Sequence, residues 1–183
     1  MKSFELKDLL KYSAIEYYRY IENSGAIISF GISTDSDMSS LTFCYNTQEW
    51  LNKSLKSTAA YNTKNNDALL PLDIDRWLLN EWKSEIDDYW KEDKYQSLLS
   101  KMYSLYKSRN EDNFLEYKIE MFDFFCQVLK ELKESQVFNQ KKSDFLLLVQ
   151  QADSPILEQH KESLKKILTK SQWNIYINEI MVD

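Results

Sequence analysis

Glycine and proline are nearly absent from this sequence of 183 residues, which contains only two of each. At average usage a chain of this length has roughly 13 glycines and about 9 prolines. The two glycines, Gly25 and Gly31, cannot form a Walker A loop or a dinucleotide-binding fingerprint, because those motifs need several closely spaced glycines. The G-x-S-x-G turn of serine hydrolases is also missing. The sequence therefore excludes the common glycine-dependent nucleotide-binding sites and the nucleophile elbow.

Cysteine and histidine are equally scarce. The two cysteines, Cys44 and Cys126, are far apart in the sequence, and His160 is the only histidine. Structural zinc sites need clustered cysteine and histidine ligands. We therefore expect no metal and no cofactor, and we interpret both cysteines as buried thiols that act as small hydrophobic residues. A disulfide between them remains open at this point.

Long apolar runs and blocks of basic residues are missing too. The longest apolar run, Phe145–Val149, is far shorter than the ~20 residues that span a bilayer. The N-terminal residues carry charges where a secretion signal has its apolar core. Acidic residues outnumber basic ones by 29 to 23, which gives a net charge of −6, whereas nucleic-acid binding needs a basic surface. We expect a cytoplasmic protein that binds neither membranes nor nucleic acids.

The remaining composition is that of a folded domain, with 43% hydrophobic and 14% aromatic residues. Alternating apolar residues over 28–32 and 41–45 predict an antiparallel hairpin, and Phe145–Val149 predicts a strand that is buried on both faces and therefore central. Residues 56–75 are polar and aperiodic, which predicts a loop. Helical periodicity predicts helices over 4–22, from Asn46 or Thr47 to about 55, 76–92, 94–108, 112–137, from 155 (capped by Asp153 or Ser154), and over 173–180.

These elements predict a single domain over residues 1–183. Its fold class is α+β, with a small, mostly antiparallel sheet of three or more strands packed by several helices, and it is helix-rich overall.

The sequence offers few groups for catalysis. His160 borders the apolar side of its predicted helix, but no motif supplies a nucleophile or an orienting carboxylate. We therefore interpret it as a structural or surface residue. A deep polar pocket with a carboxylate facing His160 would instead favour an enzyme.

Charge is distributed unevenly along the chain. Residues 67–93 contain nine acidic and three basic residues, whereas the rest of the chain is balanced, so the whole net charge of −6 lies in this acidic segment. Three tryptophans are interleaved with the acids, and tryptophan is enriched at binding hot spots. The segment is therefore either a solvated face that aids solubility or a recognition surface for a basic partner. For the second case, the predicted contacts are Trp77, Glu81, Trp82, Glu85, Asp88 and Glu92.

Three short patterns also suggest a relationship. They are Asn46–Leu51, the box Arg76-Trp77-Leu78-Leu79-Asn80-Glu81-Trp82, and the stretch that runs from Leu129 and Leu132 through Phe138 to Asp144–Asp153. Together they resemble an uncharacterised family of small bacterial proteins, catalogued as a domain of unknown function. The resemblance implies soluble intracellular proteins, some of which act as immunity proteins beside polymorphic toxins. It implies no catalytic residues.

The leading hypothesis is a non-enzymatic protein of the immunity type, which neutralises a toxin-like protein with a basic surface. One alternative is a small-ligand-binding protein or enzyme with a pocket between sheet and helices, using His160 or a carboxylate. Another is a structural adaptor or homodimer whose acidic segment is only solvated.

Overall fold

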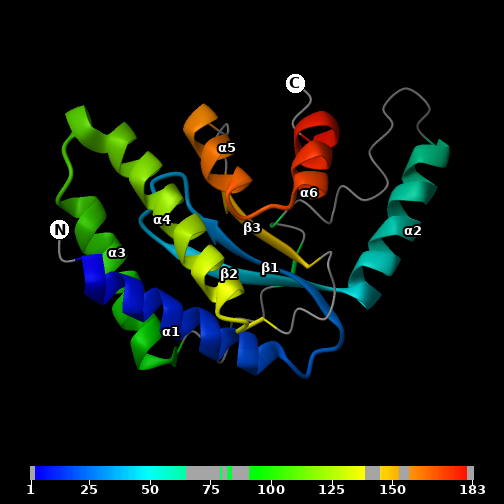
Figure 1. Cartoon of the computed structure of the whole chain (residues 1–183), viewed down its shortest axis with the longest axis horizontal. Coiled ribbons are helices and arrows are strands. Elements are labelled where there is room, and N and C mark those ends of the chain that lie inside the picture. Colours follow the sequence, from blue (N-terminus) through cyan, green and yellow to red (C-terminus); the bar gives the residue numbers. More distant parts are fainter. Residues whose placement is uncertain are drawn as a thin grey trace.

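The computed structural model describes residues 3–64, 79, 82–83, 91–138, 145–152 and 157–180. Within these residues, three strands form one mixed sheet around which the helices pack (Figure 1). The strands are β1 (Ile27–Thr34), β2 (Leu41–Thr47) and β3 (Leu146–Gln151). The α-helices are α1 (Ser3–Ile21), α2 (Gln48–Lys64), α3 (Asp93–Lys107), α4 (Phe114–Glu134), α5 (Glu158–Lys165) and α6 (Lys170–Ile175), and α6 continues as a π-helix over Tyr176–Ile180. The predicted helix-rich α+β class is confirmed.

The described sheet has the order β2-β1-β3. Strands β1 and β2 form the predicted antiparallel hairpin, whereas β1 and β3 are parallel. The sheet is therefore mixed, with one pair of each kind. The prediction that Phe145–Val149 forms the central strand is wrong, because β3 lies at the edge of the described sheet. Its apolar run is explained by burial on both faces: Leu146 to Val149 are each at most 1% exposed.

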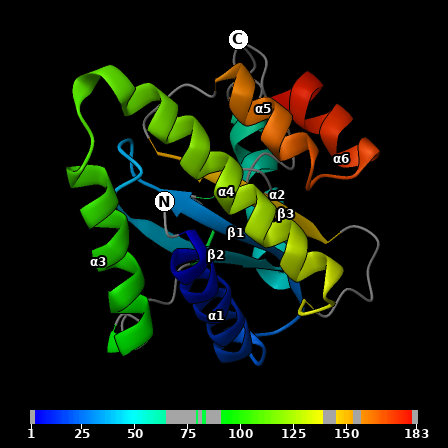
Figure 2. The same cartoon turned by 60° about the vertical axis from the view of Figure 1, so that its left-hand side comes forward.

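One face of the sheet carries an aromatic layer. The ring of Phe30 in β1 lies 6.2 Å from Tyr17 and 6.0 Å from Tyr18 of α1, and 5.1 Å from Phe138. Phe43 of β2 stacks beside it at 5.9 Å. Helices α1 and α4 lie over this face, with α3 beside α1 and α5 beside α4 (Figure 2). These large rings bury much apolar area and fix how the helices sit on the sheet.

The opposite face of β1 carries small residues, and we call it the small face. Gly31 has no side chain, and Leu79 occupies the space: a Cβ at Gly31 would lie 2.5 Å from Leu79 Cδ2 and 2.8 Å from the Leu148 carbonyl oxygen. The Leu79 amide also donates a hydrogen bond of 2.7 Å to Gln150 Oε1. Four residues later, Lys83 and Tyr45 of β2 exchange two backbone hydrogen bonds, each of 3.0 Å. The described part of the acidic segment is thus held on the sheet.

Two predictions in this region need correction. The predicted loop over 56–75 is wrong for 56–64, because α2 extends to Lys64; the remaining residues lie outside the described part. Helix α2 has no apolar periodicity there because, among its described side chains, only Leu51 is buried. The continuous helix over 76–92 is wrong at residues 82 and 83, where a turn leads into the bridge to Tyr45.

The other helix predictions agree closely with the structure. Thr47 is the residue that caps α2, since its Oγ1 accepts a hydrogen bond of 3.2 Å from the Trp50 amide. The exception is the start of the helix predicted from residue 155, which is wrong: α5 begins at Glu158, and its N-cap is Leu157, with an extended backbone and no capping side-chain hydrogen bond, rather than Asp153 or Ser154. None of the described helices has the length and apolar character needed to cross a membrane.

Replacing Gly31 by alanine tests the close packing on the small face. The new Cβ would overlap both Leu79 and the Leu148 carbonyl, so we expect Gly31→Ala to lower the free energy of unfolding by about 1–3 kcal/mol. Urea denaturation measures this. Ser33→Ala, at the next position on the same face, is the control and should change stability by less than about 1 kcal/mol. Equal effects of the two substitutions would contradict the packing described.

Candidate functional site

The structure separates the six predicted partner contacts into two groups. Trp77, Glu81, Glu85 and Asp88 lie outside the described residues, whereas Trp82 and Glu92 lie within them. Trp82 is only 5% exposed and belongs to the hydrophobic core. It therefore attaches the acidic segment to the sheet and does not offer its ring to a partner.

Glu92 is the one predicted contact that the structure describes as exposed. It stands at the N-cap of α3, and its side chain forms no capping hydrogen bond. Its carboxylate therefore stays available at the end of the acidic segment, where the chain enters α3.

A hollow of about 330 Å³ lies beside Glu92, between α1 and the start of α3. We call it the α1–α3 hollow. Two exposed tyrosines line it, Tyr12 at 42% and Tyr20 at 48% exposure. The remaining lining residues are Glu16, Arg19, Glu92, Lys94 and Tyr95.

A charged group lies against one aromatic wall of this hollow. The Lys94 ammonium lies 3.4 Å from the centre of the Tyr12 ring. Arg19 forms an ion pair of 2.6 Å with Glu16 one turn away, and the Tyr95 hydroxyl donates a hydrogen bond of 2.6 Å to the Leu41 carbonyl. Exposed tyrosines are suited to protein contacts, because they bury a large area with little loss of side-chain freedom.

The α1–α3 hollow is absent from the sequence predictions, which use only the apolar stripe of the first helix, the face that packs on the sheet. Tyr12, Glu16 and Tyr20 recur every four residues and so form a second face of the same helix. That spacing was the available signal, but the partner element, α3, is distant in sequence.

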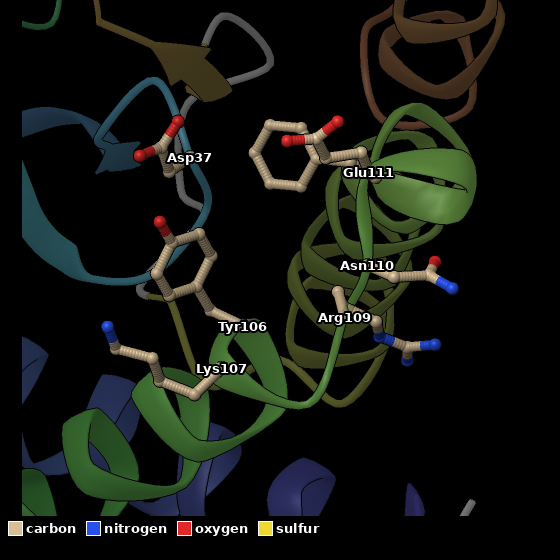
Figure 3. Close-up of a pocket in the computed structure, with 7 residues that line it drawn as sticks. Asp37, Tyr106, Lys107, Arg109, Asn110 and Glu111 are labelled. Atoms are coloured by element: carbon tan, nitrogen blue, oxygen red, sulfur yellow. The ribbon is translucent and has the colours of Figure 1, made fainter.

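A second hollow, of about 350 Å³, lies between the β1–β2 loop and the connection from α3 to α4 (Figure 3). We call it the α3–α4 hollow. It combines two aromatic residues with charges of both signs. The lining residues are Asp37, Tyr106, Lys107, Arg109, Asn110, Glu111 and Phe114.

His160 has the surroundings of a buried core residue rather than those of a catalytic base. It is 1% exposed and stacks on Phe122, with ring centroids 4.1 Å apart and planes 9° apart. Neither ring nitrogen has a hydrogen-bond partner among the described residues. Burial, aided by the positive charge of Lys118, lowers the pKa of His160 to about 4. The structural interpretation therefore fits, whereas a general base oriented by a carboxylate does not.

The cysteines are free and buried, as the sequence predicts. Burial raises the pKa of Cys44 to about 12, and it raises the pKa of Cys126 well above the usual value. Such thiols remain protonated and react slowly, because the thiolate is the nucleophile. Within the described ranges, no group of three or more His, Cys, Asp and Glu side chains is placed to hold a metal ion.

Over its described residues, the protein has an α+β fold with a mixed sheet of three strands and a hollow at each end of α3. The chain belongs to the family described as "Domain of unknown function (DUF4303)", whose model matches residues 7–167. The predicted membership of an uncharacterised family is confirmed. Comparison with curated proteins and with solved structures gives no match.

The burial of His160 predicts a specific loss of stability in acid. The unfolded chain takes up a proton on this histidine below about pH 6.5, whereas the folded protein resists protonation until about pH 4. Stability should therefore fall as the pH drops through this window, by roughly 1–3 kcal/mol from His160 alone. Urea denaturation of the wild type and of His160→Phe measures it, because carboxylates contribute equally to both proteins. Identical pH profiles would contradict a buried neutral His160.

The burial of both cysteines predicts that the folded protein resists thiol reagents. At about pH 8, Cys44 and Cys126 should react with a disulfide reagent such as DTNB far more slowly than free cysteine does. In guanidinium chloride both thiols should react at once. Rapid reaction of either thiol in the folded state would show that its surroundings open to solvent.

Proposed function

We propose that this protein is a non-enzymatic, cytoplasmic binding protein of the immunity type, which neutralises a toxin-like protein by covering its basic surface. The contact surface in this proposal is the acidic segment together with the adjoining α1–α3 hollow. The observation that carries the proposal is the position of Glu92, because this exposed end of the acidic segment lines a hollow with two exposed tyrosines.

Anchoring of the acidic segment supports the proposal. Leu79, Trp82 and Lys83 are fixed on the sheet, and Glu92 leads directly into α3. The described residues therefore attach the segment that carries the chain's net charge of −6 at both its middle and its end.

Charge complementarity indicates the kind of partner. A concentrated negative potential speeds encounter with a basic protein and makes binding sensitive to salt. Toxins that cleave nucleic acids are one such class, since binding phosphate needs a basic surface. Exposed tyrosines at the edge of the charge would supply the apolar contact area.

The state of the chemically reactive side chains also favours binding over catalysis. His160 and both cysteines are each at most 4% exposed. The burial that lowers the pKa of the histidine and raises the pKa values of the thiols keeps all three neutral near pH 7. Each of these groups is thus withdrawn from a substrate in solution.

Charge reversal tests the acidic part of the surface. The partner is obtained by affinity capture from the native cell, guided by any toxin-like coding sequence beside this gene, and is then purified. Replacing Glu81, Glu85 and Asp88 by lysine should weaken binding at least about tenfold and flatten its dependence on salt. Titration calorimetry at several salt concentrations measures both.

A matched triple reversal provides the control for net charge. Glu116, Glu120 and Glu162 are exposed acids on α4 and α5, and replacing them by lysine changes the total charge equally. This control variant should bind nearly as well as the wild type. If the first triple variant binds as tightly as the wild type, the acidic segment is not the contact surface.

Truncation of the exposed tyrosines tests the aromatic part. Tyr12→Ala and Tyr20→Ala should each weaken binding of the same partner by about five- to thirtyfold, as expected for hot-spot residues. Tyr103→Ala, which removes a tyrosine of 51% exposure outside the hollow, should leave binding unchanged. Equal effects at all three positions would remove the α1–α3 hollow from the proposal.

A further inference from the structure

The α3–α4 hollow contains two acidic side chains that the rest of the fold does not use. Asp37 lies in the β1–β2 loop, and Glu111 begins a 3-10 turn before α4. Neither carboxylate takes part in a hydrogen bond or ion pair with another described residue. In Figure 3 the two carboxylates lie on either side of one opening, with the Tyr106 hydroxyl on the side of Asp37.

The other acid of the same loop, Asp35, differs from Asp37 because its carboxylate is fully hydrogen-bonded. Its Oδ1 accepts hydrogen bonds from the amides of Ser39 (2.7 Å) and Ser40 (3.4 Å). Its Oδ2 accepts from both serine hydroxyls, at 2.5 and 2.9 Å. The loop thus supplies hydrogen bonds to both oxygens of the Asp35 carboxylate, whereas the Asp37 carboxylate faces the hollow.

The loop that carries Asp37 is held firmly. Met38 is fully buried with a φ of 56°, a conformation that is costly for a bulky residue. Its carbonyl accepts a hydrogen bond of 2.9 Å from the Tyr117 hydroxyl. The side-chain amide of Gln151 donates a hydrogen bond of 2.5 Å from Nε2 to the Ser36 carbonyl. Asp37 is therefore presented by a fixed backbone.

Aromatic rings form the wall between the two carboxylates. The rings of Tyr106 and Phe114 meet edge to face, 6.1 Å apart. Both already attract cations of the chain itself, because Lys107 Nζ lies 5.8 Å from the Tyr106 ring centre and Lys118 Nζ lies 5.4 Å from that of Phe114. A ring face flanked by carboxylates favours a cation.

The two basic residues that line the hollow direct their charged groups away from the space between the two acids. The Arg109 guanidinium lies 5.1 Å from the centre of the Tyr117 ring, and Lys107 lies 5.3 Å from that of Tyr103. Figure 3 shows both groups on opposite sides, away from the space between Asp37 and Glu111. The lining thus contains two acids, two bases and Asn110, and the polar groups that Figure 3 shows around the opening itself are the Asp37 and Glu111 carboxylates and the Tyr106 hydroxyl.

We propose that the α3–α4 hollow binds an arginine side chain of a partner protein, with its guanidinium against the aromatic wall and between Asp37 and Glu111. Arginine fits better than lysine, because its planar group stacks on rings and donates several hydrogen bonds in one plane. Acids on two different elements can then be bridged by one group. This inference stands independently of the proposed function, because it concerns another surface and can be tested without the natural partner.

Titration with a peptide-like arginine tests the proposal. N-acetyl-L-arginine methylamide, added to the full chain labelled with nitrogen-15, should shift amide signals of residues 35–40 and 106–114 and saturate in the millimolar range. N-acetyl-L-citrulline methylamide has the same shape without the charge, and it should bind at least about fivefold more weakly. Equal binding of the two compounds would overturn the proposal, as would shifts that are confined to other parts of the chain.

Two single variants, their double variant and one control locate the site. Asp37→Asn and Glu111→Gln should each weaken arginine binding about threefold, the scale of a partly exposed ion pair, and the double variant should abolish saturation. Asp112→Asn, an exposed acid next to Glu111 that does not line the hollow, should bind as the wild type does. Unchanged spectra without ligand confirm that each variant folds. Retained binding in the double variant overturns the site.

The free amino acid distinguishes a protein-borne arginine from a metabolite. L-arginine carries an additional ammonium and carboxylate, which the peptide-like probe lacks. It should bind no more tightly than the probe. Binding at least tenfold tighter would overturn the assignment to a partner protein and identify the hollow as a small-molecule site. Saturation by inorganic phosphate in place of arginine would show that Lys107 and Arg109 define the hollow.

Discussion

The approach of Leu79 to Gly31 is the contact on which the arrangement of the described functional surface depends. Only a residue without a side chain leaves room above the centre of the sheet, and Leu79 fills that room. Trp82 and Lys83 then continue along the same segment onto β2. The two faces of β1 therefore differ, because one carries the large aromatic layer and the other receives Leu79. Of the acidic segment, the structure describes residues 79, 82–83 and 91–93, and Leu79 and Lys83 contact the sheet.

Helix α3 connects the two hollows. The α1–α3 hollow lies at its first turn and the α3–α4 hollow at its last. A helix of 15 residues is about 22 Å long, at 1.5 Å per residue. The two surfaces are therefore separate, with Tyr12 and Tyr20 at one end of the helix and Asp37 and Glu111 at the other.

The sequence predicted the elements whose burial follows a period. Helices α1, α3 and α4 and the hairpin all place one face on the core, so their residues repeat visibly. The predictions failed for elements whose burial does not follow the period of a helix or a strand. Among the described side chains of α2 only Leu51 is buried. Strand β3 is buried on both faces although it lies at the edge of the described sheet. Trp82 is among the predicted partner contacts because tryptophan is enriched at binding hot spots, whereas the structure buries it in the core. Its attachment to β2 is a contact distant in sequence, as are both hollows, and such contacts leave no local pattern.

The central claim is that the acidic segment and the first turn of α3 form one binding surface. Hydrogen–deuterium exchange of the full chain, with and without its purified partner, tests this claim most directly. The account predicts that binding slows exchange at residues 12–20 and 82–95, while α2 and α5 exchange as in the free protein. Protection that is confined to α2 or α5, with no change at residues 12–20 and 82–95, would contradict it.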